Sequence, residues 1–269
     1  MSHIRLIISD IDGTILNDHH QIDPQLAALI PDLKREEIPF VLASARSPRG
    51  MAPIAKELGI EDCPIACYNG ALIQKGDQVL FEHPLDKTEA RNFIDWAKEH
   101  FPQVSINLYS GKDWMTDRLD QWSQEEARIT GEKPLILPLL DPLLDTTKPL
   151  HKLLLIGEPE EIQALYRAIS TDDFPSTAFY LSKANYLEVT AKHVSKEDAL
   201  VELANHYHLS LEEVLTMGDN FNDLPMLKKA GIGVAMGNAP QEVKEGAAVV
   251  TKTNNENGAG QAVETYVLI

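Results

Sequence analysis

The chain has 269 residues, enough for one large domain or two modest ones, and 43% of them are hydrophobic, which is ample for a core and excludes a disordered protein. The formal net charge of −17 argues against nucleic acid or an anionic membrane as a partner, because both are bound largely through Lys and Arg. No apolar run approaches the roughly 20 residues of a membrane span, and neither a secretory signal nor a cysteine framework is found, so we expect a cytoplasmic protein.

The first element of the chain is an apolar run that ends in acidic residues. The run 4–8 predicts a buried strand, and Asp10 and Asp12 follow it, before a Gly-Thr pair. Two carboxylates two residues apart repel each other and resist burial, so the pair makes sense if a divalent cation neutralises it. Oxygen ligands of this kind suit Mg²⁺. The alternative is an ordinary turn, since Asp and Gly favour turns.

A second strand candidate, 39–43, is followed by a potential anion site. Ser47 can cap a helix that begins at Pro48, which is a favoured arrangement. The hydroxyl and the backbone N–H groups around Ser44 would then be available to a phosphate oxygen at a strand end and helix start. Read alone, this segment is more simply explained as a helix cap.

The middle of the chain has an organisation of its own. Helix and strand patterns alternate between residues 88 and 189, and the Pro-rich stretch 134–149 is the predicted long loop. We therefore predict an inserted domain at 84–188, a sheet with helices on one face, between the two parts of a core domain, 1–83 and 189–269.

Two further segments complete the pattern. Residues 186–190 predict a strand, and Lys196 then stands in the first turn of a predicted helix, where a lysine is usually a solvated charge. Residues 214–217 predict another strand, with Asp219 and Asp223 after it. Because the carboxyl ends of parallel strands meet at one edge of a sheet, four Asp residues would gather there, and Lys196 gains interest as their cation. Such a cluster would be strongly unstable without a metal.

These segments, in this order, resemble the four motifs of the haloacid dehalogenase-like superfamily. The chain is most similar to the Cof-type sugar-phosphatase branch, in which a large C2-type cap is inserted between motifs two and three, and the resemblance spans essentially the whole chain. It departs from the family at Ala45, where Gly is frequent, and at Glu197, where many members carry a small residue. The resemblance implies an α/β fold: a Rossmann-like core with a mostly parallel sheet, and an inserted α+β cap.

The resemblance also implies the activity of a Mg²⁺-dependent phosphatase. It would hydrolyse small phosphomonoesters, such as sugar phosphates, pyridoxal phosphate or FMN, through an aspartyl-phosphate intermediate. The roles implied are nucleophile for Asp10, general acid and base for Asp12, metal binding for Asp10, Asp12 (through its backbone carbonyl), Asp219 and Asp223, phosphate binding for Ser44, Lys196 and Asn222, and supporting or substrate contacts for Arg46 and Asn69. An acid two residues after the nucleophile favours phosphoryl transfer over dehalogenation, because a halide leaves without a proton.

Two alternative functions stay open. A phosphomutase acting on sugar phosphates would use the same aspartyl-phosphate, and a phospho-regulatory protein would carry phosphate on an Asp without turnover. The sequence does not name the substrate, and it favours a monomer, because the expected cap already covers the site.

Overall fold

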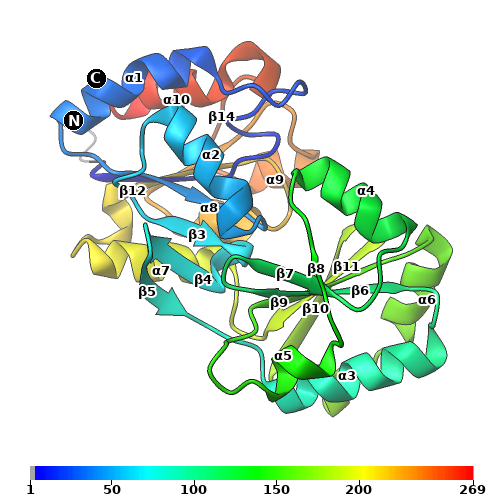
Figure 1. The fold of residues 1–269 in the computed structure, drawn as a ribbon. Helices are drawn as coiled ribbons and strands as arrows, with labels where there is room; N and C mark the ends of the chain where they lie inside the picture. The colour runs from blue at the N-terminus through cyan, green and yellow to red at the C-terminus, as the bar shows by residue number, and fades with distance from the viewer. Residues whose placement is uncertain (1–3, 269) are drawn as a thin grey trace. The chain divides into compact units, whose positions relative to one another are not determined.

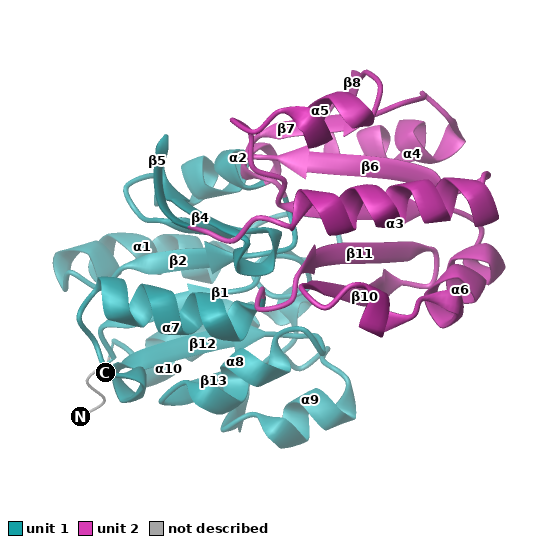
Figure 2. Ribbon diagram, turned by 90° about the horizontal axis from the view of Figure 1, so that it is seen from below, with its two compact units in different colours: residues 1–46, 51–81, 195–269 teal, residues 47–50, 82–194 magenta. Residues whose placement is uncertain are grey.

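The computed structural model describes residues 4–268, and the chain forms two compact units (Figure 2). Unit 1 comprises residues 1–46, 51–81 and 195–269, and unit 2 comprises residues 47–50 and 82–194. The domain limits expected from the sequence, at 84 and 188, stay a prediction, and their terminal residues 1–3 and 269 lie outside the described residues. Within residues 4–268, none of the helices has the length and the apolar content that crossing a bilayer requires.

Unit 1 is built on an eight-stranded sheet in the order β14-β13-β12-β1-β2-β3-β4-β5 (Figure 1). All pairs from β14 to β3 are parallel, and β4 joins β3 in an antiparallel manner. The mostly parallel sheet expected from the sequence is therefore confirmed. The strands are β1 (Leu6–Ser9), β2 (Phe40–Ala43), β3 (Ile65–Cys67), β4 (Leu72–Lys75), β5 (Gln78–Glu82), β12 (Val214–Gly218), β13 (Ile232–Ala235) and β14 (Val249–Val250).

The central strands of unit 1 are apolar at nearly every position because both faces of the sheet are covered. Leu6, Ile7 and Ile8 of β1 are all fully buried. Helices α1 and α10, from opposite ends of the chain, lie side by side (Figure 1), and Asp23 at the start of α1 accepts a hydrogen bond of 2.8 Å from the Gly260 N–H. The helices are α1 (Pro24–Arg35), α2 (Pro48–Leu58), α7 (Lys196–His206), α8 (Leu224–Lys229), α9 (Gln241–Gly246) and α10 (Gly258–Tyr266).

Unit 2 contains a six-stranded sheet in the order β10-β11-β9-β6-β7-β8. Neighbouring strands are antiparallel, except that β7 and β8 are parallel. The strands are β6 (Ser105–Ser110), β7 (Asp113–Thr116), β8 (Leu135–Ile136), β9 (Lys152–Ile156), β10 (Thr177–Lys183) and β11 (Tyr186–Ala191). The helices are α3 (Lys87–His100), α4 (Gln121–Thr130), α5 (Leu140–Leu144) and α6 (Pro159–Ala168).

The two faces of the unit 2 sheet differ in polarity. Alternate residues such as Leu187 and Val189 join an apolar cluster with α3, α5 and α6, so Tyr186 and Glu188 point to the opposite face. Helix α4 contacts that second face, where the Tyr186 hydroxyl donates a hydrogen bond of 2.6 Å to Glu126. The expectation of helices on one face only is therefore wrong, because α4 presents a polar residue that the polar face can bind.

The Pro-rich stretch 134–149 is not the long loop expected from the sequence. It contains strand β8, which pairs with β7, and the short helix α5, whose Leu143 packs into the apolar cluster of unit 2. The few apolar residues between the prolines are sufficient to form β8 and α5, because these elements pair with β7 and pack against the apolar cluster of unit 2.

Candidate active site

Two acidic loops leave neighbouring strands of unit 1 at the same edge. Strands β1 and β12 are parallel, with Ser9 opposite Met217, and the Asp10 N–H donates a hydrogen bond of 3.0 Å to the Met217 carbonyl. Gly13 has a left-handed backbone (φ +77°), and a Cβ at this position would lie 2.4 Å from the carboxylate of Asp219. Only glycine therefore lets the loop after β1 close upon the loop after β12.

Three carboxylates are brought together at this edge. Oxygen atoms of Asp10, Asp219 and Asp223 all lie within 4.8 Å of one another. Asp10 and Asp223 are buried, with 7% and 0% of their surface exposed. Oδ2 of Asp223 accepts hydrogen bonds from the N–H groups of Asp219 (2.9 Å) and Asn220 (3.0 Å). These two bonds hold the Asp223 carboxylate in place. We call Asp10, Asp219 and Asp223 the carboxylate cluster.

Among residues 4–268, one buried ammonium group contacts the carboxylate cluster. Lys196, in the first turn of α7, donates hydrogen bonds to Asp10 and, at 2.6 Å, to Asp223. Its side chain is only 1% exposed. Burial opposes the charge of the ammonium, but the attraction of Asp10 and Asp223 outweighs it and raises the pKa of Lys196 above its ordinary value.

The carboxylate cluster carries more negative charge than Lys196 can balance. Burial raises the pKa of Asp10 well above its usual value, with Lys196 opposing and the other carboxylates adding to the effect. Burial and the charge of Asp223 raise the pKa of Asp219 to about 6. Buried carboxylate oxygens that repel one another form a donor set that a hard divalent cation would fit.

Asp12 lies outside the carboxylate cluster. Its carboxylate accepts hydrogen bonds from Arg46 Nε (2.8 Å) and Nη2 (2.6 Å), and 49% of its side chain is exposed. The side chain is thus available to a molecule in solvent, and it is not among the grouped carboxylates. A metal contact through the Asp12 backbone carbonyl stays a prediction.

The predicted phosphate-binding residues border the same edge. Ser44 is buried at the end of β2, and its hydroxyl accepts a hydrogen bond of 3.3 Å from the Arg46 N–H. Asn222 is exposed, and its Nδ2 donates to Asn69 Oδ1 at 3.5 Å. Together with Lys196, these groups offer hydroxyl, amide and ammonium donors to an anion.

Two supporting residues were missed by the sequence analysis. The buried Thr14 hydroxyl donates a hydrogen bond of 3.0 Å to Asp219, and Asn238 Nδ2 donates one of 2.8 Å to the Gly13 carbonyl. Thr14 could have been proposed as a site residue from the sequence, because it directly follows Asp10, Asp12 and Gly13. Asn238 follows β13, outside the segments that carry the acids, and nothing local marks it.

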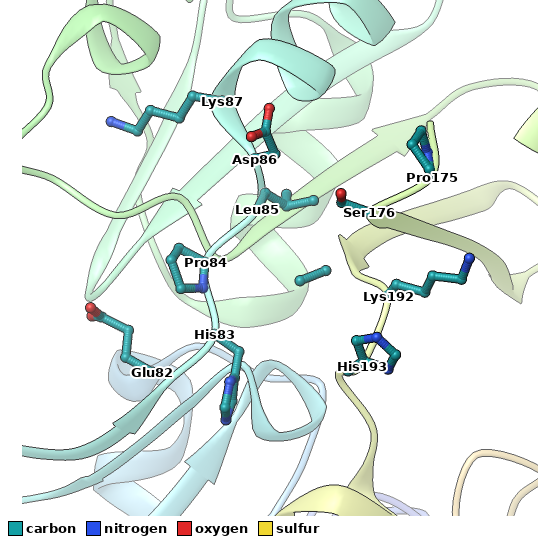
Figure 3. Close-up of a pocket in the computed structure, with 11 residues that line it drawn as sticks. Glu82, His83, Pro84, Leu85, Asp86, Lys87, Pro175, Ser176, Lys192 and His193 are labelled. Atoms are coloured by element: carbon teal, nitrogen blue, oxygen red, sulfur yellow. The ribbon is translucent and has the colours of Figure 1, made fainter. Parts of the chain in front are cut away.

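Unit 2 contains a separate hollow of about 640 Å³ (Figure 3). It is lined by the segments 82–87, 175–176 and 191–193. Asp86 accepts the N–H groups of Thr88 and Glu89 at the start of α3, and Lys87 donates to backbone carbonyls near α5, including that of Pro142 at 3.0 Å. Asp86 and Lys87 thus serve the local fold, and none of the residues that line this hollow belongs to the carboxylate cluster.

Comparisons with known proteins cover nearly the whole chain. A family described as haloacid dehalogenase-like hydrolase matches residues 7–263. A Haemophilus influenzae protein assigned as a phosphatase is 35% identical over 97% of both chains. A 5-amino-6-(5-phospho-D-ribitylamino)uracil phosphatase of Bacillus subtilis is 27% identical over 98% of this chain and 96% of its own. The crystal structure of a haloacid dehalogenase-like hydrolase from Bacteroides thetaiotaomicron superposes with a TM-score of 0.88, at 30% identity, over 97% of this chain and 98% of that one.

Proposed function

Because the chain belongs to the family of haloacid dehalogenase-like hydrolases, we propose that it is a Mg²⁺-dependent phosphatase of small phosphomonoesters that acts through an aspartyl-phosphate on Asp10. The observation that carries this proposal is the carboxylate cluster, in which buried Asp10 contacts Lys196 beside two further acids. An excess of acidic groups at a largely buried position is costly, and such groups cluster at functional sites, which supports the proposal.

In the proposed reaction, Asp10 is the nucleophile. One carboxylate oxygen forms a bond to phosphorus, and the bond from phosphorus to the ester oxygen breaks. Asp12 gives a proton to the departing alkoxide and then takes one from the water that hydrolyses the intermediate, which releases phosphate and restores Asp10. The exposure of Asp12 supports this role, because both proton transfers involve groups that come from solvent.

The remaining residues hold the transferred group. Lys196 and Ser44, with Asn222, would bind the phosphoryl oxygens and align phosphorus with Asp10. Mg²⁺, held by Asp10, the Asp12 carbonyl, Asp219 and Asp223, would supply positive charge that offsets the phosphoryl oxygens. Burial of Lys196 supports its role, since a buried ammonium keeps more of its electrostatic effect than a solvated one.

The substrate class follows from the relatives and not from this chain alone. The B. subtilis relative is named for a small phosphorylated metabolite, which supports a substrate of similar kind. We propose sugar phosphates or comparable metabolites such as pyridoxal phosphate and FMN, with the leaving group bound by residues of the insert 84–188.

The test is phosphate release from a panel of these esters, with and without Mg²⁺, beside the variant Asp10→Asn. We expect release by the wild type that requires Mg²⁺ and is abolished in Asp10→Asn, because an amide cannot attack phosphorus. Release that depends on an added sugar bisphosphate would indicate a mutase. A folded protein that releases nothing, or an active Asp10→Asn, would contradict the proposal.

A further inference from the structure

A turn after β3 has an unusual backbone in unit 1. Tyr68, Asn69 and Gly70 are left-handed at three consecutive positions, with φ of +53°, +57° and +105°. A tyrosine gains nothing from this conformation, and all three residues are buried. Conformations of this kind persist only where the surroundings enforce them, and they gather at functional sites.

The turn is hydrogen-bonded to the loop that carries Ser44. The Asn69 N–H donates to the Ser44 carbonyl at 2.8 Å, and the Tyr68 N–H donates to the Arg46 carbonyl at 3.1 Å. The Ser44 N–H in turn donates to the Ala66 carbonyl of β3 at 3.0 Å. The left-handed backbone is what aims two successive N–H groups at this loop, so the turn sets the position of Ser44.

The same turn packs closely against the helix that carries Lys196. A Cβ at Gly70 would lie 3.0 Å from both the Ser195 carbonyl and the Ala199 side chain. Glycine therefore allows the first turn of α7 to approach the backbone of this turn.

The Asn69 side chain also reaches the loop after β12. Asn222 is exposed, whereas Asn69 is only 5% exposed, and Asn222 Nδ2 donates to Asn69 Oδ1 at 3.5 Å. An amide nitrogen carries two hydrogens. A hydrogen bond from Asn222 to the buried Asn69 would restrict the orientation of the Asn222 amide and, with it, that of the second hydrogen.

We propose that Asn69 is a positioning residue for phosphate binding, which acts by orienting Asn222 through its side chain and Ser44 through its backbone N–H. This role rests on the proposed function, because it requires that Asn222 and Ser44 bind the phosphoryl group. Asn69 thus joins two loops, after β2 and after β12, that are about 180 residues apart in sequence and that bind the same anion.

A double-mutant cycle tests this role. Asn69→Gly keeps the left-handed backbone and its N–H and removes only the side chain, so we expect the KM for a hydrolysed ester to rise about 10-fold with kcat nearly unchanged. Asn222→Ala should have a similar effect. The double variant should be no worse than Asn222→Ala alone, because the Asn69 side chain acts through Asn222.

A matched control is His208→Gly, which also replaces a left-handed residue (φ +56°) but lies beyond the far end of α7 from Lys196. We expect wild-type kinetics from it. If Asn69→Gly fails to fold, Asn69→His takes its place, because His also tolerates a left-handed backbone and lacks the amide oxygen.

An unchanged KM in the Asn69 variant would overturn the role, as would effects that multiply in the double variant, because a purely structural residue gives that result. A wild type that releases no phosphate from any ester would overturn the proposed function together with this role. An active wild type with an unaffected Asn69 variant would overturn this role alone.

Discussion

Both units of the chain bury charged side chains, and they differ in the balance of those charges. In unit 1, two members of the carboxylate cluster, Asp10 and Asp223, contact the ammonium group of Lys196, and Asp219 lies beside them. In unit 2, Lys152 lies 3.4 Å from Glu188, and these side chains are 8% and 6% exposed. The Tyr180 hydroxyl adds a hydrogen bond of 3.3 Å to Glu188, so this acid has a base and a hydroxyl beside it.

The difference separates a structural pair from a functional site. A balanced buried pair with added hydrogen bonds satisfies its own charges and needs nothing from solvent. An unbalanced cluster keeps repelling carboxylates together, and the fold tolerates it only if a ligand of opposite charge stabilises it. We therefore take the excess of acid in unit 1, and not burial alone, as support for the proposed site.

The largest expected effect concerns Asp12, which belongs to unit 1 but lies outside the carboxylate cluster. Asp12→Ala should slow turnover about 10²–10⁴-fold, the usual contribution of general acid–base catalysis. Because the Asp12 side chain lies outside the carboxylate cluster, Mg²⁺ affinity should stay near that of the wild type. Steady-state kinetics with a Mg²⁺ titration measures both quantities. A large loss of Mg²⁺ affinity would place the Asp12 side chain among the ligands.

Removing the ammonium group of Lys196 should increase the excess of negative charge at the carboxylate cluster. Lys196→Met should lower kcat/KM about 10²–10³-fold, as expected when a charge that stabilises the phosphoryl oxygens is lost. The variant should also depend more strongly on Mg²⁺ for its thermal stability, because the buried carboxylates of Asp10 and Asp223 then lose the ammonium group that contacts both. Kinetics and thermal unfolding with EDTA or Mg²⁺ provide the measurement. Near-wild-type activity would remove Lys196 from the site.

The pair in unit 2 should behave differently. Lys152→Met leaves Glu188 buried without its base and should lower the free energy of unfolding by about 3 kcal/mol. The double variant Lys152→Met with Glu188→Gln should recover most of this loss, because it removes both charges. Urea unfolding of the three proteins measures this. No recovery in the double variant would show that the two charges do not act as a pair.

The smallest effect is a difference in pH dependence between the units. His151 in unit 2 is buried, its Nδ1 accepts the Gly111 N–H at 2.9 Å, and its Nε2 lies 3.2 Å from Glu82. Burial, only partly opposed by Glu82, lowers the pKa of His151 below its ordinary value of 6.5. The unfolded chain then binds the proton more readily, so this stabilisation is present at neutral pH and is lost as the pH falls below about 6.5.

His151→Gln should therefore show a smaller loss of unfolding free energy than the wild type between about pH 7 and pH 5. The carboxylates of unit 1 act in the opposite direction. Because the pKa of Asp219 is raised to about 6, protonation stabilises the metal-free fold as the pH falls through that value. If the free energy of unfolding depends on pH in the same way in the wild type and in His151→Gln, the pH-dependent stabilisation does not come from His151.

Much of the fold could be predicted because apolar runs and helix starts are local signals. The apolar run before Asp10 and the helix predicted around Lys196 agree with strand β1 and helix α7. The family resemblance, drawn from four short segments, is confirmed by a match over residues 7–263. Elements β8 and α5 were missed because their stability comes from packing against the rest of unit 2.

The candidate site was predictable to the extent that topology determines it. Parallel neighbours carry Asp10 and Asp219 to one edge, whatever the details of the loops. The ion pair between Asp12 and Arg46 was not predictable, because it depends on the conformations of two loops and two long side chains. The roles of the individual residues, the identity of the metal and the oligomeric state stay predictions.

Calorimetric titration of Mg²⁺ into the metal-free protein tests the central claim most directly. We expect one site per chain in the wild type and in Glu188→Gln, which changes the balanced pair. Binding should be lost in Asp219→Asn, which keeps the shape of the side chain and removes one charge from the carboxylate cluster. Binding that survives unchanged in Asp219→Asn, or that is absent from the folded wild type, would contradict the claim that the unbalanced acids of unit 1 form the metal site.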